Sequence, residues 1–196
     1  MLEDKKEVMG VNVMFKPRQI VKDSNPKLRE KSINVELPLS KENEELCKYL
    51  IEHLRASQDE ELATKLNLRP GVGIAAPQIG EQKRIFAVRI EEDENKVLEM
   101  VLVNPKVLAY SVMKACLQGG EGCLSVEKDY EGYVYRHNTI TVEAYDYISK
   151  QVIKKKFRGY EAIVLQHEMD HFDGVLYYDH INKENPLKVE ENSIII

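Results

Sequence analysis

Apolar residues recur at helical spacing along one early stretch of the chain. Leu46, Leu50 and Leu54 lie four residues apart, with Ile51 beside them, and Ser40 precedes an acidic first turn. Serine is a favoured N-cap residue, and this spacing is typical of an amphipathic helix. We therefore predict a helix from about residue 41 to the mid-fifties, which continues with a break to about residue 65.

Apolar runs of strand length follow in the middle of the chain. "RIFAVRI" (84–90) and "KVLEMVLVNP" (96–105) predict two strands around the polar turn "EEDEN". "NTITVEAYD" and "KQVIKKKF" predict a later hairpin that turns near Tyr147 to Lys150. The closing "SIII" is also strand-like, whereas residues 1–39 carry turn signals and little periodicity, so we expect an irregular segment with short strands.

A second helix is predicted late in the chain. It runs from about Tyr160 to Asp173, and Gly174 is its expected C-terminal stop. "RPGVGIAAPQIG" and "QGGEGCLS" contain too much glycine for a regular helix, so we expect a loop in each, or a bulged strand in the first. This order of strands and helices predicts an α+β fold with mostly antiparallel pairing.

Composition narrows the class of protein. The 196 residues are 43% hydrophobic and 31% charged, which is typical of a globular protein, and we expect one domain over residues 1–196. The first fifteen residues mix acids with lysines, and no apolar run approaches membrane-spanning length, so we expect a cytoplasmic protein without membrane contact. Three cysteines without a C-x-x-C pair indicate reduced thiols.

The charge pattern gives no support for nucleic-acid binding. The formal net charge is −5, and basic residues are scattered apart from Lys154-Lys155-Lys156. On a strand these three lysines would alternate between the two faces. That arrangement is typical of a solvated edge rather than of a nucleic-acid patch.

Candidate metal chemistry lies in "QHEMDH" (166–171). His167 and His171 are four residues apart, so on a helix both imidazoles project from one face and can reach one ion. Glu168 is rotated by about 100° from His167, which places it near a metal-bound water as a general base. The alternative is a chance match in a polar helix.

Two histidines need a further ligand, and several candidates exist. A third histidine at metzincin spacing is excluded, because that position is Tyr177. A thermolysin-like glutamate would have to come from the polar tail that holds Glu184, Glu190 and Glu191. His180 follows the strand-like "VLYYD" and suits a surface or structural role.

Cys123 is the favoured third ligand. It lies in "GGEGCLS", and glycine allows a loop to approach a helix closely. A small buried hydrophobic residue is the alternative interpretation of this cysteine. One cysteine and two histidines leave one position of a tetrahedral site open, which is typical of a catalytic metal.

The blocks "GVGIAAPQ" (71–78), "EGCLS" (121–125) and "QHEMDH" (166–171) together resemble the motifs of the peptide deformylase family, in the family's order. The length, the insertion around "SQDEELATKLNLRPG" and the strand-like C-terminus resemble its longer, second bacterial type. Phe172 departs from the pattern, where leucine is usual. The resemblance implies an α+β fold in which antiparallel sheets pack around a central helix that carries the HExxH motif.

The resemblance also implies a reaction. It is the removal of the N-formyl group from the formylmethionine of nascent polypeptides at the ribosome, with release of formate and with metal-bound water as nucleophile. Separately from the resemblance, we expect a monomer. The implied roles are metal ligation by Cys123, His167 and His171, general acid/base catalysis by Glu168, and oxyanion stabilisation by Gln78 and the Leu124 backbone N–H. A loop-stabilising amide is the alternative for Gln78. The resemblance favours Fe²⁺ in the cell, with Zn²⁺, Ni²⁺ or Co²⁺ as alternatives in purified protein.

Substrate contacts can be predicted in part. Tyr160, Ile163 and Val164 precede His167 on or near its metal-bearing face and predict an apolar pocket that suits an unbranched methionine side chain. Ordinary core packing is the alternative for these three residues. We also expect Val72 and Gly73 to pair with an extended peptide, and Gly122 to contact substrate beside the ligand loop.

Two other functions are open at this point. A zinc endopeptidase would use the same helix motif, but would cleave unformylated peptides and casein. A structural-metal or peptide-binding module would not depend on the Glu168 carboxylate. The enzyme hypotheses require it.

Overall fold

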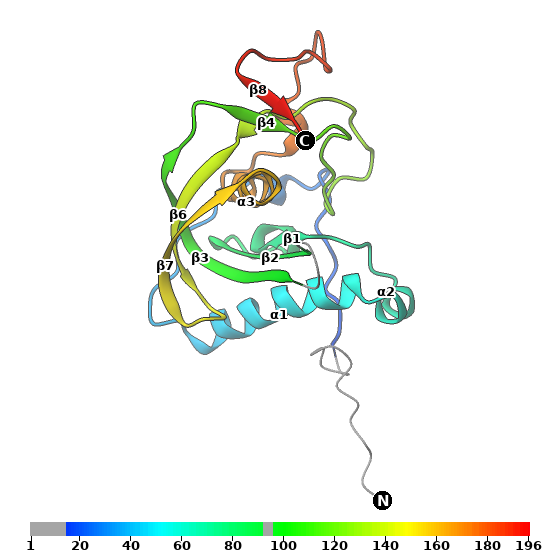
Figure 1. Ribbon diagram of the computed structural model, residues 1–196. Coiled ribbons are helices and arrows are strands. Elements are labelled where there is room, and N and C mark those ends of the chain that lie inside the picture. The colour runs from blue at the N-terminus through cyan, green and yellow to red at the C-terminus, as the bar shows by residue number, and fades with distance from the viewer. Residues whose placement is uncertain (1–14, 92–95) are drawn as a thin grey trace, which may run out of the picture.

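The structure, a computed structural model, describes residues 15–91 and 96–196 (Figure 1). In these ranges the strands form a five-stranded antiparallel sheet in the order β1-β2-β3-β6-β7 and a three-stranded sheet in the order β5-β4-β8. The strands of the larger sheet are β1 Gly73–Ala75, β2 Ile85–Glu91, β3 Val97–Tyr110, β6 Thr139–Asp146 and β7 Gln151–Arg158. Those of the smaller sheet are β4 Lys114–Cys116, β5 Arg136–His137 and β8 Ser193–Ile195, and β8 runs parallel to β4.

The first helix, α1 (Lys41–Gln58), packs against β1, β2 and β3 of the larger sheet (Figure 1). Its N-cap is Ser40, whose side chain accepts a hydrogen bond from the Asn43 N–H. The helix ends before Asp59, whose side chain caps a second helix, α2 (Glu60–Leu66). The predicted helix, its cap and its break are confirmed.

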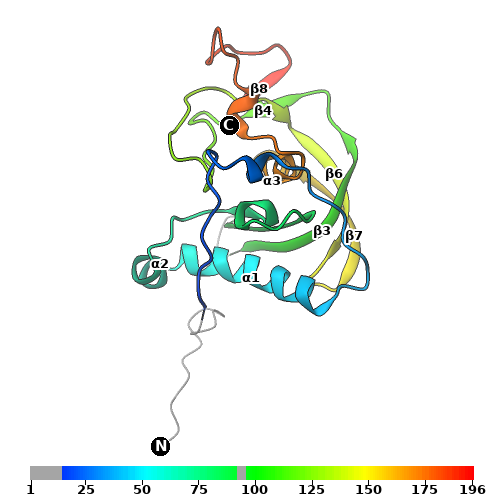
Figure 2. The same ribbon diagram turned by 180° about the vertical axis from the view of Figure 1, so that it is seen from behind.

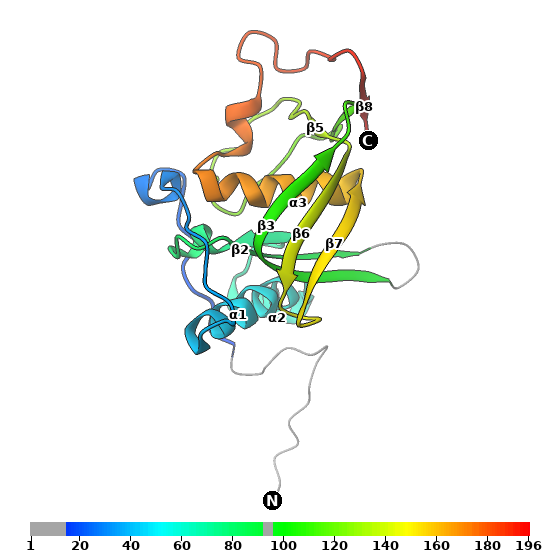
Figure 3. The same cartoon turned by 90° about the vertical axis from the view of Figure 1, so that its left-hand side faces the viewer.

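The late helix, α3 (Tyr160–Asp170), lies on the other face of the larger sheet and contacts β5 of the smaller one (Figure 3). Along β2, Phe86 and Val88 pack in the cluster with α3, whereas Ile85 and Ala87 pack in the cluster with α1. A strand covered on both faces has a continuous apolar sequence. The predicted α+β fold with sheets around a central helix is confirmed. Across residues 15–91 and 96–196 no helix is long and apolar enough for a membrane span.

The end of α3 is fixed by a tight turn. A 3-10 helix, His171–Asp173, follows α3, and Gly174 then adopts a φ of 69°. The backbone of Arg29 occupies the place where a Cβ at position 174 would lie, with the Arg29 carbonyl carbon 2.6 Å from it. The left-handed conformation and this close approach both require glycine.

The hairpin β6–β7 matches the predicted strands to within one residue at each end, and its turn lies at residues 147–150 as predicted. Because β7 is the outer strand of the sheet, Lys154, Lys155 and Lys156 are all exposed. The predicted solvated edge is confirmed.

Some predicted elements differ in the structure. β3 continues past Pro105 to Tyr110, because a register shift against β6 between Val103 and Lys106 accommodates a residue without an N–H. The "VLYYD" prediction is wrong, since Tyr177–His180 is a 3-10 helix. "GVGIAAPQ" combines a strand, β1, with a 3-10 helix, Ala76–Ile79.

The short strands predicted within residues 1–39 are also wrong for the part that is described. Residues 15–39 contain a 3-10 helix, Pro26–Arg29, and one isolated bridge between Ile33 and Lys83. The backbone of residues 15–39 makes isolated hydrogen bonds to loops that are distant in sequence, so this segment forms no β-ladder. Figure 2 shows the segment passing beside α3. Residues 1–14 and most of the predicted "EEDEN" turn lie outside the described residues.

Candidate metal centre

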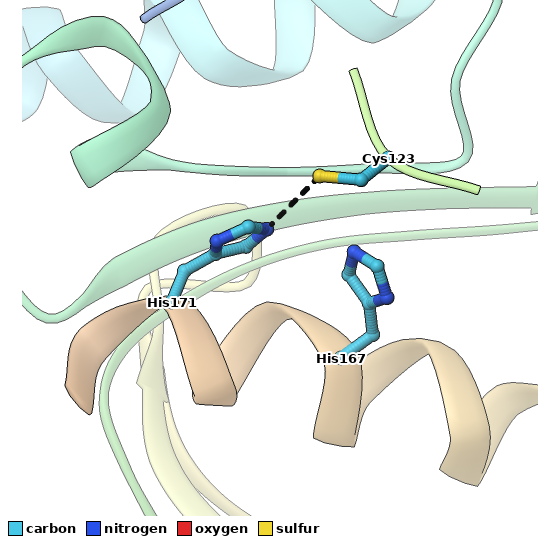
Figure 4. A group of neighbouring side chains, drawn as sticks. All are labelled: Cys123, His167 and His171. Carbon is cyan, nitrogen blue, oxygen red and sulfur yellow. Dashed lines mark hydrogen bonds between the residues drawn. The ribbon is translucent and has the colours of Figure 1, made fainter. Parts of the chain in front are cut away.

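Three side chains that can bind a metal meet between a loop and α3 (Figure 4). Cys123 lies in the irregular segment between β4 and β5, His167 lies in α3, and His171 directly follows α3. Their ligand atoms all lie within 4.8 Å of one another, and all three residues are buried. The structure therefore brings together the three residues predicted as ligands.

The separation of these donors fits a tetrahedral metal ion. Bonds from zinc to sulfur and to nitrogen are about 2.3 Å and 2.0–2.1 Å, so two such ligands at a tetrahedral angle lie about 3.6 Å apart. Cys123 Sγ is 3.5 Å from His171 Nε2. In the described part of the chain no fourth histidine, cysteine or carboxylate joins the group, which leaves one tetrahedral position for water or substrate.

The surroundings of Cys123 favour the form that binds metals. Burial by itself would raise the pKa of the thiol, but the imidazoles of His171 and His167 hold that pKa well below its usual value. The thiolate is the metal-binding and nucleophilic form of cysteine.

A carboxylate sets the orientation of His167. Glu121 Oε2 lies 2.7 Å from His167 Nδ1, so Nε2 is the ring nitrogen left for a metal. Arg136 donates to both Glu121 oxygens, at 2.6 and 3.0 Å, and to Asp170 at 2.8 Å. Burial would raise the pKa of Glu121, but the charge of Arg136 and the bond to His167 lower it.

Sequence reasoning missed these supporting residues. Glu121 and Asp170 lie inside the motif blocks, and this position in the sequence could have indicated that they support the site. No motif or spacing in the sequence indicated Arg136. His180 bonds to Asp170 at 2.8 Å and lies outside the metal group, which agrees with a surface or structural role. Tyr177, which excluded the metzincin pattern, is buried and stacks on His167 with ring centroids 6.2 Å apart.

Glu168 lies buried beside the three ligands. Only 4% of the residue is exposed. Its Oε2 atom has no hydrogen-bond partner among residues 15–91 and 96–196. Burial raises the pKa of Glu168 to about 7. Gly73 makes room for it, since a Cβ at position 73 would lie 2.7 Å from Glu168 Cδ.

The two residues predicted as oxyanion donors lie next to Cys123. Gln78 Nε2 is 3.2 Å from Ser125 Oγ and 3.4 Å from Cys123 Sγ, and its Oε1 accepts from the Ala75 N–H at 2.8 Å. The Gln78 amide thus also stabilises its loop. The Leu124 N–H has no acceptor within the described residues, so it is free to donate to a ligand.

A cavity of about 680 Å³ opens onto this group. The six residues predicted to bind substrate all line it: Val72, Gly73, Gly122, Tyr160, Ile163 and Val164. Cys123, Leu124, Gln78, His167 and Glu168 line the same cavity. Ile163 and Val164 are also part of the buried interior, whereas Tyr160 is 40% exposed at the rim. Leu117, Arg69 and Arg89 line the cavity as well and were not predicted.

Comparison with known proteins assigns the chain to one family. Residues 17–186 match the family model described as polypeptide deformylase. A peptide deformylase of Oceanobacillus iheyensis is 47% identical over 180 residues, which cover 92% of this chain and 98% of that protein. One from Listeria monocytogenes serotype 4b is 49% identical over 167 residues, covering 85% and 91%.

Solved structures agree with this result. A crystal structure of a probable peptide deformylase from Synechococcus phage S-SSM7 has a TM-score of 0.69 at 34% identity and covers 84% of this chain and all of that one. An actinonin-bound class I type b peptide deformylase from Acinetobacter baumannii has a TM-score of 0.64 at 27% identity, with 85% and 99% covered. The likeness to these two structures extends over most of this chain and nearly all of theirs. The chain therefore belongs to the polypeptide deformylase family.

Proposed function

We propose that this chain hydrolyses the formamide of N-formylmethionyl nascent peptides to give formate and a free amino terminus. The observation that supports this most directly is the grouping of Cys123, His167 and His171 beside the buried Glu168 carboxylate, at the wall of an open cavity. The family of the chain agrees with this reaction and disfavours an endopeptidase.

The residues of the site have distinct proposed roles. A divalent metal held by Cys123, His167 and His171 would act as a Lewis acid and lower the pKa of bound water toward about 7. Glu168 accepts a proton when the formyl carbon is attacked and delivers it to the amine nitrogen as the C–N bond breaks.

Two donors are proposed to stabilise the oxygen that becomes negative. They are the Gln78 Nε2 amide and the free Leu124 N–H, both beside Cys123. Removal of one such donor typically costs about 3 kcal/mol in the transition state. Gln78 is held in place for this by its bonds to Ala75 and Ser125.

The substrate backbone is proposed to pair with β1, an outer strand of the larger sheet. The Val72 carbonyl already accepts from the Arg89 N–H at 2.8 Å. Because bonding directions alternate along a strand, the N–H and C=O of Gly73 point away from β2 and can bond an extended peptide. The methionine side chain would then lie against Ile163 and Val164.

Metal identity and cellular context follow as proposals. We propose Fe²⁺ in the cell, with Zn²⁺, Ni²⁺ or Co²⁺ able to occupy the same donor set. We propose one catalytic domain over residues 1–196, of the longer type, acting as a cytoplasmic monomer on nascent chains at the ribosome without binding nucleic acid. The inserted α2 and the C-terminal strand β8 support the longer type.

An anaerobic assay tests the proposed reaction. Purified protein is given a formyl-Met tripeptide, and formate release is measured with metal content on the same sample. We expect formate in proportion to bound metal and no cleavage of casein. A metal-loaded sample that releases no formate would contradict the proposal, and casein cleavage would indicate the endopeptidase.

A further inference from the structure

The loop at residues 123–126 lies outside any helix or strand, yet distant groups bond its successive carbonyls. From one direction, Arg69 Nη1 donates to the carbonyls of Cys123 and Val126, each at 3.3 Å. The Cys123 carbonyl also accepts from the Val126 N–H at 3.2 Å. These hydrogen bonds satisfy the carbonyls of an irregular loop that is not part of a β-sheet.

The carbonyls of Leu124 and Ser125, between those two, are bonded by the N-terminal segment, which passes beside α3 in Figure 2. Val21 N, Lys22 Nζ and Asp23 N donate to the carbonyls of Gln78, Leu124 and Ser125, at 2.8, 3.1 and 2.9 Å respectively. Three consecutive residues therefore connect both loops that carry the proposed oxyanion donors.

Leu124 is flanked by two peptide planes, and each is held by a cation. The plane that contains the Leu124 N–H also contains the Cys123 carbonyl, which Arg69 bonds. The next plane contains the Leu124 carbonyl, which Lys22 bonds. When both planes are fixed, the dihedral angles of Leu124 are fixed, and so is the direction of its N–H.

We propose that Lys22 is a positioning residue for this reaction: its ammonium group holds the Leu124 carbonyl and so keeps the Leu124 N–H aimed into the cavity. This inference rests on the proposed function. Lys22 does not line the cavity, whereas Arg69 does, so an effect of Lys22 on catalysis has to pass through the loop.

The test compares Lys22→Met with Lys27→Met. Methionine keeps the length of the side chain and removes the donor, and Lys27 is an exposed lysine of the same segment. For Lys22→Met we expect kcat to fall about tenfold, with KM and metal content within twofold of wild type, because the donor is misdirected rather than removed. Lys27→Met should match wild type, and Lys22→Arg should recover most of kcat, since arginine can also donate to a carbonyl.

A second measurement is independent of turnover. Hydrogen exchange of the peptide that covers residues 121–126, followed by mass spectrometry, should be faster in Lys22→Met and unchanged in Lys27→Met. Wild-type kcat and wild-type exchange in Lys22→Met would overturn the proposal. So would a loss of rate that is fully explained by lost metal or a lowered melting temperature. If wild type releases no formate, the proposed function fails, while the exchange result still decides whether Lys22 orders the loop.

Discussion

At the scale of single residues, the site depends on the absence of a side chain at position 73. Glycine at position 73 has no side chain, and the Glu168 carboxylate occupies the space that a Cβ would need. Glu168 in turn has a carboxylate oxygen without a hydrogen-bond partner in the described ranges. Its position is therefore set by packing against β1 rather than by hydrogen bonds to that oxygen.

Gly73→Ala should displace Glu168 and slow formate release by roughly 100-fold, since a shift of about 1 Å at a catalytic group has that effect. Metal content should stay unchanged, because the atoms nearest to a Cβ at position 73 all belong to Glu168 and not to the three ligands. Steady-state kinetics with metal analysis would check this. Gly119→Ala is the control, because a Cβ at 119 meets no atom within 4 Å. A wild-type rate in Gly73→Ala would contradict this account of Glu168.

Glu168→Gln keeps the shape of the side chain and removes its ability to accept a proton. We expect turnover to fall by about 10² to 10⁴ with metal retained. The measurement is formate release with metal analysis of the same preparation. Full activity in this variant would favour a structural-metal or peptide-binding role over catalysis.

At the scale of elements, the longer helices and strands could be predicted because residue spacing, capping and packing favour the same structure in them. The four-residue spacing of Leu46, Leu50 and Leu54, with Ser40 as cap, is sufficient for α1. The N-terminal segment could not be predicted in this way. Its backbone is satisfied by residues such as Gln78 that are distant in sequence, and such pairing leaves no period in the chain.

One buried histidine of α1 should make stability depend on pH. His53 is 2% exposed, and burial lowers its pKa from 6.5 to about 4. The unfolded chain binds the proton more tightly, so stability is fully present above pH 6.5 and is lost as the pH falls toward 4.

Urea unfolding at pH 7 and pH 4.5 would measure this effect. His53→Leu should reduce the loss of unfolding free energy between the two values by about 2 kcal/mol relative to wild type. An equal loss in both proteins would show that His53 is not buried in its neutral form. Carboxyl groups that titrate in both proteins contribute equally to the two losses of unfolding free energy, so they do not affect the difference between them.

At the scale of the whole molecule, the site is assembled from parts that are far apart in sequence. Arg29 of the N-terminal segment bonds the Gly174 carbonyl at 3.0 Å and the side chains of Tyr178 and Asp179. The motif blocks predicted the ligands and Glu168, because each block carries its own chemistry. They could not predict the bond from Arg136 to Glu121, which depends on how the smaller sheet meets α3.

Gly174→Ala tests this long-range contact. An alanine at φ 69° is strained by roughly 1–2 kcal/mol, and its Cβ would also overlap the Arg29 backbone. We expect the unfolding free energy to fall by at least about 2 kcal/mol, as measured by denaturant titration. A change below about 0.5 kcal/mol, the size of an ordinary surface substitution, would show that the segment does not need this close approach.

The link between Arg29 and Asp179 also has a consequence for the order in which the protein is made. A ribosome releases residues from the N-terminus onward, so Arg29 is synthesised long before its partner. A chain that has been extended only to residue 171 contains Cys123, His167 and His171 and the carbonyls that Val21, Lys22 and Asp23 bond, but it lacks the three partners of Arg29, which are Gly174, Tyr178 and Asp179. The contacts that tie Arg29 to the chain beyond α3 therefore form only after all three proposed metal ligands have been synthesised.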